Sequence, residues 1–255
     1  MRARRAAAWA GALLGLVLVA LVVETAWVAT RDYVPAESAP PADAQIVPTV
    51  SGDPRSPLRL VVVGDSTGAG IGASRTESTV GGRLAVTVAE AAQRAVSLRN
   101  IAVSGARARD LADQLDAALE LEPEVVVVLI GANDVTHLTT LGSVRRDLGD
   151  AVRRARGAGA RVVVGTCPDM GGATVFPHPL RELAAWRGRA VAKSERSAVR
   201  TAGGTAVDLA AETGPAFRAR PEVMLSVDRF HPSDAGYALW ADALAPATVE
   251  AATAR

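Results

Sequence analysis

The chain has 255 residues, of which 49% are hydrophobic and 22% are charged. This length suits one sizeable α/β domain with additional segments, and the apolar share excludes an intrinsically disordered chain. The 28 Lys and Arg residues nearly balance the 27 Asp and Glu residues, so the composition offers no concentrated basic surface for nucleic acid. The single cysteine, Cys167, cannot form an internal disulfide, and no His or Cys cluster has metal-site spacing. We expect neither a metal nor a nucleic-acid partner.

The N-terminus consists of a basic flank followed by an apolar run. Arg2, Arg4 and Arg5 precede residues 6–23, which carry no charge. As a helix rising about 1.5 Å per residue, this run would extend roughly 27 Å, close to the thickness of the hydrocarbon layer of a bilayer. The basic flank should stay in the cytoplasm, which predicts that the rest of the chain lies outside it.

Two interpretations of this segment are open, a retained signal anchor and a cleaved signal peptide. The run exceeds the roughly 7 to 15 apolar residues typical of a signal peptide, and no good cleavage site follows it closely. A sequence that would suit a signal peptidase, at residues 42–44, lies far from the run. We therefore favour a single-pass membrane anchor over residues 1–30, with secretion as the alternative if the segment is cleaved.

Residues 31–57 differ in composition from the rest of the chain. They contain six prolines among Ala, Ser and Asp residues, so a helix is excluded over most of this range. The composition predicts an extended stalk that holds the folded domain, residues 58–255, away from the membrane.

From residue 58 onward, continuous apolar runs alternate with apolar stripes at helical spacing. The runs predict strands at residues 58–63, 97–103, 125–130, 161–165 and 205–209. Ser233 is the predicted N-cap of a C-terminal helix. Strands separated by helices indicate right-handed βαβ units and a parallel sheet covered on both faces. In such sheets ligands bind beyond the carboxyl ends of the strands.

The loops that follow the first three strands, and one loop before the last helix, have unusual sequences. They are residues 64–70 (GDSTGAG), 103–107 (VSGAR), 131–135 (GANDV) and 228–232 (DRFHP). The first loop matches neither phosphate-binding pattern, G-x-G-x-x-G or the Walker motif with its lysine. It does match G-x-S-x-G of the α/β-hydrolases, but that serine normally follows several strands rather than the first.

Taken together, the four loops resemble the SGNH (GDSL) family of esterases and lipases. The family blocks correspond to Gly64-Asp65-Ser66, Gly105, Gly131-Ala132-Asn133-Asp134 and the Asp228-x-x-His231 pair. The matches follow the family order and span residue 58 to about residue 244, with Thr67 in place of the family's leucine. This resemblance implies a three-layer α/β/α domain with a flavodoxin-like, five-stranded, mainly parallel sheet in the order 2-1-3-4-5.

The resemblance also implies roles for individual residues. Ser66 would be the nucleophile, His231 its general base, and Asp228 the group that orients the imidazole. The backbone N–H groups of Ser66 and Gly105 and the side-chain amide of Asn133 would form the oxyanion hole. No cofactor is needed for this chemistry.

The expected function is that of an exported serine esterase acting on O-acyl esters of a lipid or carbohydrate. Its partners would be a small-molecule, lipid or glycan ester and, through the N-terminal helix, the membrane. Two alternatives are open: an O-acyltransferase that uses the same triad, and a membrane-tethered binding module without catalysis. The sequence carries no signal for the oligomeric state.

Other residues of chemically active types are expected to be structural. Neither His137 nor His178 has an Asp at useful spacing on a loop that follows a strand, so both are expected to be structural or to line a pocket. Asp65 and Asp134 are expected to hold their loops through side-chain to backbone hydrogen bonds. Cys167 is expected to be a small core residue.

Overall fold

The structure is a computed structural model that describes residues 2–41, 43–47 and 53–254. Within these residues the sheet has six strands in the order β1-β3-β2-β4-β5-β6. The strands are β1 (Ala44–Ile46), β2 (Asp53–Gly64), β3 (Arg94–Asn100), β4 (Val125–Leu129), β5 (Arg161–Gly165) and β6 (Thr205–Val207). β2 to β6 pair in parallel, and β1 pairs antiparallel with β3. The five predicted strands thus have the predicted order 2-1-3-4-5, and β1 adds a sixth strand at the edge.

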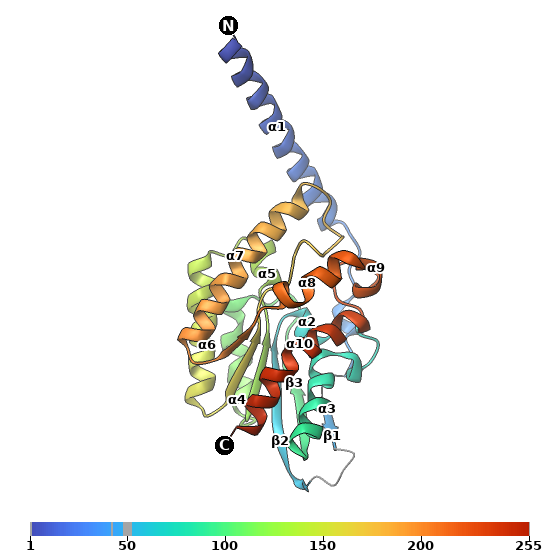
Figure 1. The fold of residues 1–255 in the computed structure, drawn as a ribbon, viewed down its shortest axis with the longest axis vertical. Coiled ribbons are helices and arrows are strands. Elements are labelled where there is room, and N and C mark those ends of the chain that lie inside the picture. The colour runs from blue at the N-terminus through green and yellow to red at the C-terminus, as the bar shows by residue number, and fades with distance from the viewer. Residues whose placement is uncertain (1, 42, 48–52, 255) are drawn as a thin grey trace.

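Helices cover both faces of this sheet and form the two outer layers (Figure 1). One face packs against α4 (Leu111–Leu119), α6 (Leu141–Gly157) and α7 (Leu180–Thr201). The other face packs against α3 (Val80–Ala92), α8 (Leu209–Ala219) and α10 (Asp234–Thr253). Alternate residues of each strand enter the two cores: Val126 and Val128 lie in the first, Val125 and Val127 in the second. The three-layer α/β/α architecture is therefore confirmed.

The carboxyl ends of the central strands lie level with one another. Gly64 of β2 is in register with Leu129 of β4, which is in register with Gly165 of β5. The loops that follow these strands therefore emerge at one edge of the sheet. The short helices α2 (Ser66–Ala69) and α5 (Ala132–Thr136) begin at this edge.

Several strand boundaries differ from the prediction, and those of β2 and β3 differ most. β3 begins three residues before the predicted residue 97 and ends at Asn100. The following residues still lie beside β2, because the N–H groups of Ile101 and Val103 donate to the carbonyls of Val62 and Gly64 at 2.8 and 3.0 Å. β2 begins at Asp53, within the range predicted as a stalk.

The segment predicted as a free stalk packs on the domain over much of its described length. β1 pairs with β3, Asp43 forms an ion pair with Arg99 at 2.9 Å, and Pro40 is buried. The composition correctly excludes a long helix, but proline content does not report whether an extended chain finds a partner. Whether such a segment packs on the domain depends on contacts with residues far away in the sequence, and these contacts produce no pattern in the local sequence.

The N-terminal helix α1 (Arg2–Ala29) projects away from the domain (Figure 1). Its segment Trp9–Ala29 is long and apolar enough to cross a membrane, a property that signal sequences share. A loop that contains the 3-10 helix η1 (Ala36–Ser38) follows α1 and runs along the domain towards β1.

Candidate active site

Ser66 is the first residue of helix α2 and is separated from the end of β2 by one residue, Asp65. The turn between them needs Gly64, whose φ is +137° and whose Cβ position would lie 1.9 Å from the carbonyl oxygen of Leu129. Asp65 caps the helix by accepting hydrogen bonds from the N–H and the hydroxyl of Thr67, at 2.9 and 2.7 Å. This turn holds the buried Ser66 side chain at the carboxyl edge of the sheet.

Gln114 supports this turn and was missed by the sequence analysis. Its side-chain amide forms two hydrogen bonds with the backbone of Gly64. It accepts from the glycine N–H at 2.7 Å and donates to the glycine carbonyl at 2.9 Å. A detectable signal was present, because Gln114 is a polar residue on the apolar stripe formed by Leu111, Leu115 and Ala118. A buried amide among apolar neighbours usually has a specific hydrogen-bonding task.

The structure brings Ser66, His231 and Asp228 together. The Ser66 Oγ lies 2.9 Å from Nε2 of His231, and the Asp228 Oδ2 lies 2.6 Å from Nδ1 of the same ring. Asp228 and His231 lie on the loop before α10, whose N-cap is Ser233, as predicted. The loop folds back over the sheet edge because the N–H of Ser226 donates to the His231 carbonyl and the N–H of Ser233 donates to the Met224 carbonyl, at 2.8 and 2.9 Å.

Asp228 is held by five hydrogen bonds that favour its ionised form. Its Oδ1 accepts from the hydroxyl of Ser226 and from the N–H groups of Phe230 and His231, at 2.8 to 2.9 Å. Its Oδ2 accepts from the His231 ring and, at 3.1 Å, from the N–H of Val34. Burial raises the pKa of the Asp228 carboxyl, but the hydrogen bonds from His231 and Phe230 outweigh burial and hold this pKa well below its ordinary value.

An ionised Asp228 determines the tautomer of His231. A carboxylate only accepts hydrogen bonds, so the ring nitrogen beside it, Nδ1, must carry a proton. In the neutral ring Nε2 is then unprotonated, and it accepts a hydrogen bond from the hydroxyl of Ser66. The geometry therefore supplies a base in contact with the serine.

Gly105 and Asn133 reach the same site from the two neighbouring loops. Gly105 has a φ of +82°, and a Cβ at this position would meet no atom within 4 Å, so its backbone faces open space. Asn133 is the second residue of α5, and its Nδ2 donates to the Ala106 carbonyl at 3.1 Å. An amide nitrogen carries two hydrogens, so this hydrogen bond orients the side chain and leaves one hydrogen free for a ligand.

One cavity connects the predicted site residues. It has a volume of about 640 Å³, and its lining includes Ser66, Gly105, Asn133 and His231. The remaining lining is mostly apolar and includes Phe176, Leu180, Leu183 and Phe230, together with Thr25, Val28, Ala29, Tyr33 and Val34 from the N-terminal segment. The volume is within the range of about 300 to 1,000 Å³ found for ligand sites.

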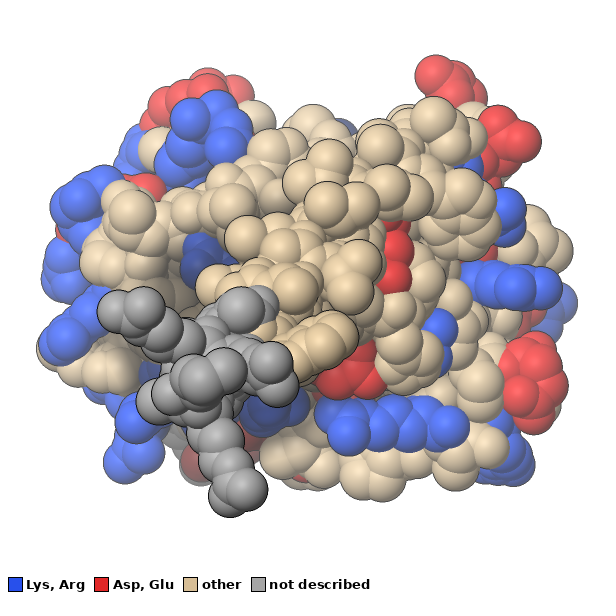
Figure 2. Space-filling model, turned by 90° about the horizontal axis from the view of Figure 1, so that it is seen from above, with Lys and Arg blue, Asp and Glu red and all other residues tan. Residues whose placement is uncertain are grey.

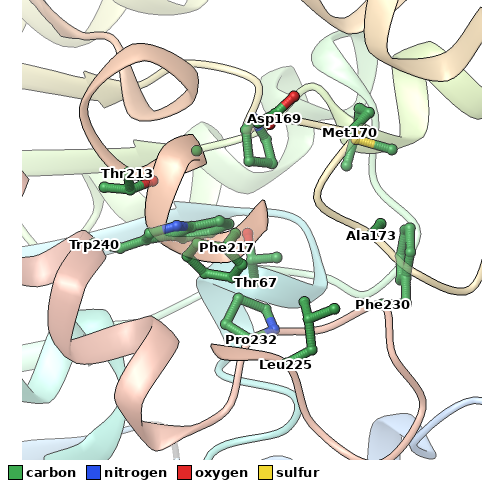
Figure 3. Close-up of a pocket in the computed structure, with 13 residues that line it drawn as sticks. Thr67, Asp169, Met170, Ala173, Thr213, Phe217, Leu225, Phe230, Pro232 and Trp240 are labelled. Atoms are coloured by element: carbon green, nitrogen blue, oxygen red, sulfur yellow. The ribbon is translucent and has the colours of Figure 1, made fainter. Parts of the chain in front are cut away.

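A second, much smaller cavity lies next to the same loops. Thr67, Phe230 and Pro232, the sequence neighbours of Ser66 and His231, line it together with the rings of Phe217 and Trp240 (Figure 3). Its volume is about 30 Å³. This space holds about one water molecule and is too small for an acyl group.

The histidines expected to be structural lie apart from the serine. His178 is exposed and pairs with Glu182. His137 lines the larger cavity, and its Nδ1 lies 2.9 Å from the Asn133 carbonyl oxygen. Neither has the contact with Ser66 that His231 makes.

The acidic residues and the cysteine expected to be structural are buried. Asp65 caps its own helix, whereas Asp134 accepts from the N–H of Ala108 in the neighbouring loop at 3.0 Å. Burial raises the pKa of both carboxyls, that of Asp65 to about 6. Cys167 is fully buried, and burial raises the pKa of its thiol well above the ordinary value, which disfavours a nucleophilic thiolate. In the described part of the chain, no group of three or more His, Cys, Asp or Glu residues is placed to hold a metal ion.

Comparisons with known proteins agree with this architecture. The family model of the GDSL-like lipase/acylhydrolase family matches residues 62–239. GDSL-like esterase Rv1075c of Mycobacterium tuberculosis is 43% identical over 198 residues, which are 77% of this chain and 63% of that protein. The chain thus matches less than two thirds of the length of this relative.

Solved structures with the same fold are more distant in sequence. The lipase/acylhydrolase from Enterococcus faecalis superposes with a TM-score of 0.59 at 19% identity, covering 74% of this chain and 94% of that one. The acetylxylan esterase Axe2 from Geobacillus stearothermophilus superposes with a TM-score of 0.55 at 20% identity, covering 76% and 94%. These similarities establish the fold, and the matched residues 62–239 contain all four loops of the site. The chain belongs to the GDSL-like lipase/acylhydrolase family.

Proposed function

We propose that the protein is a membrane-anchored, extracytoplasmic serine esterase that hydrolyses O-acyl esters of a lipid or carbohydrate. The observation that carries the proposal is the contact of Ser66 Oγ with Nε2 of His231, whose other ring nitrogen faces Asp228. Ser66 and His231 line a cavity of ligand size rather than lying in a closed core. Membership of a family of lipases and acylhydrolases and the 43% identity to a protein named as an esterase support the same reaction class.

In the first half of the proposed reaction, Ser66 Oγ attacks the carbonyl carbon of the ester while His231 Nε2 takes the hydroxyl proton. The resulting imidazolium is stabilised by Asp228, which remains a carboxylate throughout. The bond to the alcohol oxygen then breaks, and Nε2 returns its proton to this oxygen. The alcohol leaves, and the acyl group stays on Ser66.

In the second half, water replaces the alcohol. The water oxygen attacks the acyl carbon while His231 Nε2 takes one of the water protons. The bond between the acyl carbon and Ser66 Oγ then breaks, and Nε2 passes this proton to Oγ. A carboxylic acid leaves, and the serine hydroxyl is restored. In both halves the negative carbonyl oxygen would be held by the N–H groups of Ser66 and Gly105 and by the free Nδ2 hydrogen of Asn133.

The proposed location follows from the N-terminal segment. Residues 1–30 would anchor the chain, residues 31–57 would connect the anchor to the domain, and the domain would lie outside the cytoplasm. The support is the length and hydropathy of residues Trp9–Ala29 together with the three arginines that precede them.

The test combines covalent labelling with turnover. The full chain in detergent should react with a fluorophosphonate probe and hydrolyse p-nitrophenyl esters, and Ser66→Ala should lose both activities without a change in Tm. Ser56→Ala is the matched control, because this exposed serine is near the opposite end of the same strand. It should retain full labelling and turnover.

The outcomes separate the alternatives. Absence of labelling in a folded protein would contradict the proposal and favour a binding module. Labelling at Ser66 with transfer of the acyl group to an added sugar in preference to water would instead identify an acyltransferase.

A further inference from the structure

The cavity at Ser66 has a wall that the chain's own N-terminal segment provides. Thr25, Val28 and Ala29 from the last two turns of α1, followed by Tyr33 and Val34, line the same space as Ser66 and His231. We name residues 24–34 the membrane-proximal wall. An apolar helix that only tethered the domain would have no reason to contribute to its active site.

Specific contacts hold this wall against the domain. The carboxylate of Glu24 accepts a hydrogen bond at 2.9 Å from the N–H of Leu180, the first residue of α7. A first-turn N–H has no partner inside its helix, so an acidic side chain is a favourable partner there. The Tyr33 ring meets the Phe230 ring edge-on at 5.6 Å, and the Val34 N–H donates to Asp228 at 3.1 Å. The wall therefore contacts the loop that carries the proposed acid and base.

Exposed apolar residues outside this wall also line the cavity. Leu138 and Leu183 line it although their side chains are 70% and 43% exposed, and Trp186, one turn beyond Leu183 on α7, is 62% exposed. On the face from which α1 projects, most charged side chains lie towards the edges (Figure 2). An exposed apolar rim next to an apolar helix is typical of a surface that meets lipid.

The depth of the cavity relative to a bilayer follows from the helix itself. Residues Trp9–Ala29 number 21, and at about 1.5 Å per residue they extend roughly 30 Å, the thickness of the hydrocarbon layer. If this helix spans the bilayer, Thr25 and Val28 lie at its outer boundary. Trp27, with the Arg31 guanidinium 4.7 Å from its ring centroid, is placed where interfacial tryptophans occur. The cavity then opens at the level where acyl esters of membrane lipids are found.

We propose that the membrane-proximal wall determines the specificity of the site, and that the substrate is a lipid ester whose acyl chain lies in the bilayer. The acyl chain would pass from the membrane between Val28 and Leu183 and place its ester carbonyl at Ser66. This proposal rests on the proposed serine esterase activity and narrows its substrate from lipid or carbohydrate esters to membrane lipids.

The test compares a membrane-held ester with a soluble one. The full chain is reconstituted into vesicles of diether phosphatidylcholine, which has no acyl ester of its own, doped with a fluorogenic long-chain diacylglycerol. Val28→Trp should slow lipid hydrolysis at least about tenfold, in line with the discrimination that small changes of pocket volume produce, while p-nitrophenyl acetate hydrolysis stays within about twofold. A short acetyl group does not need the acyl cavity.

The matched control is Val23→Trp. This residue is 61% exposed on the same helix and does not line the cavity, so the variant should hydrolyse both substrates like the wild type.

Failure of this proposal is distinguishable from failure of the esterase proposal. If the wild type neither hydrolyses p-nitrophenyl acetate nor labels with a fluorophosphonate, the esterase function itself is wrong. If the wild type hydrolyses the soluble ester but not the vesicle lipid, or if Val28→Trp affects both substrates equally, the wall does not select membrane lipids.

Discussion

Two aspartates of the site have opposite pKa shifts although both are buried. Asp65 receives hydrogen bonds from the N–H and hydroxyl of Thr67, and burial still raises its pKa to about 6. Asp228 receives five hydrogen bonds, one of them from a histidine, and its pKa is held below the ordinary value. Asp228 thus has more hydrogen-bond donors than Asp65, and these donors outweigh the effect of its burial on the pKa.

The raised pKa of Asp65 predicts a dependence of stability on pH. Between about pH 4 and pH 6 the folded state retains a proton that the unfolded chain has lost, so the free energy of unfolding falls as the pH rises. The difference between 3.8 and about 6 corresponds to about 3 kcal/mol at 1.36 kcal/mol per pH unit. Asp65→Asn should remove this decline in urea unfolding measured from pH 4 to pH 7. Parallel curves for the two proteins would contradict the prediction.

Asn133 tests the proposed oxyanion hole separately from the triad. Removing one oxyanion donor typically lowers turnover about 10²- to 10³-fold, so Asn133→Ala should lower kcat by this factor with little change in KM. Asn133→Asp keeps the shape of the side chain but replaces the donor NH2 group with an acceptor oxygen. Its kcat should be at least as low as that of Asn133→Ala. A rise in KM with unchanged kcat would instead make Asn133 a residue that binds the ground state.

At the scale of elements, the site depends on the level ends of β2, β4 and β5. β2 and β4 each lead through a glycine with a positive φ, Gly64 and Gly131, into a short helix. Gly64 lies so close to the Leu129 carbonyl that the two strands could not keep this register with any side chain at position 64. Ser66 is therefore placed by the pairing of two strands and by Gln114 rather than by local propensity.

A pair of glycine variants measures this constraint. Gly64→Ala adds a Cβ at a positive φ and 1.9 Å from a backbone oxygen, and it should lower the free energy of unfolding by more than about 4 kcal/mol or prevent folding. Gly142 lies in the first turn of α6, and a Cβ there would have no atom within 4 Å. Gly142→Ala should therefore raise the free energy of unfolding by about 0.5 to 1 kcal/mol. Urea unfolding of both variants provides the comparison, and equal effects would show that the contact at Gly64 is relaxed.

At the scale of the whole molecule, the chain combines an α/β/α domain with a helix that projects from the active-site edge of its sheet. The described part of the connecting segment packs on the domain, and its residues Tyr33 and Val34 line the cavity at Ser66 together with α1. Cleavage near Ala44 would remove Tyr33 and Val34 together with α1, and Asp228 would lose one of its donors. This dependence favours a retained anchor over a cleaved signal peptide.

Retention of the anchor predicts how the protein partitions on fractionation. The full chain should stay in the membrane pellet after an alkaline carbonate wash, and protease added outside the cytoplasm should digest the domain. A chain that begins at Arg31, without α1, is the control and should be extracted. A soluble wild-type protein whose N-terminus is near Ala44 would overturn the anchor assignment.

Local patterns in the sequence determined the architecture and the candidate residues. Buried parallel strands are continuous apolar runs, and the helices between them carry one apolar stripe, so their alternation predicts the three layers without any knowledge of contacts. Ser66, Gly105 and Asn133 each follow a strand of this sheet. Parallel strands bring such positions to one edge, and the structure places them on one cavity with His231. Their catalytic roles stay a prediction.

Only the tertiary structure decided which distant segments complete the site. Val34 and Asp228 are 194 residues apart, and an extended, proline-rich segment has the same composition whether it lies on the domain or in solvent. The short edge strand β1 has three residues, too few for a periodic signal, and its pairing with β3 supplies what its sequence lacks. Periodicity reports that a face of one element is buried, but not which other element buries it. The wall that α1 contributes to the active site therefore became visible only when the chain was folded.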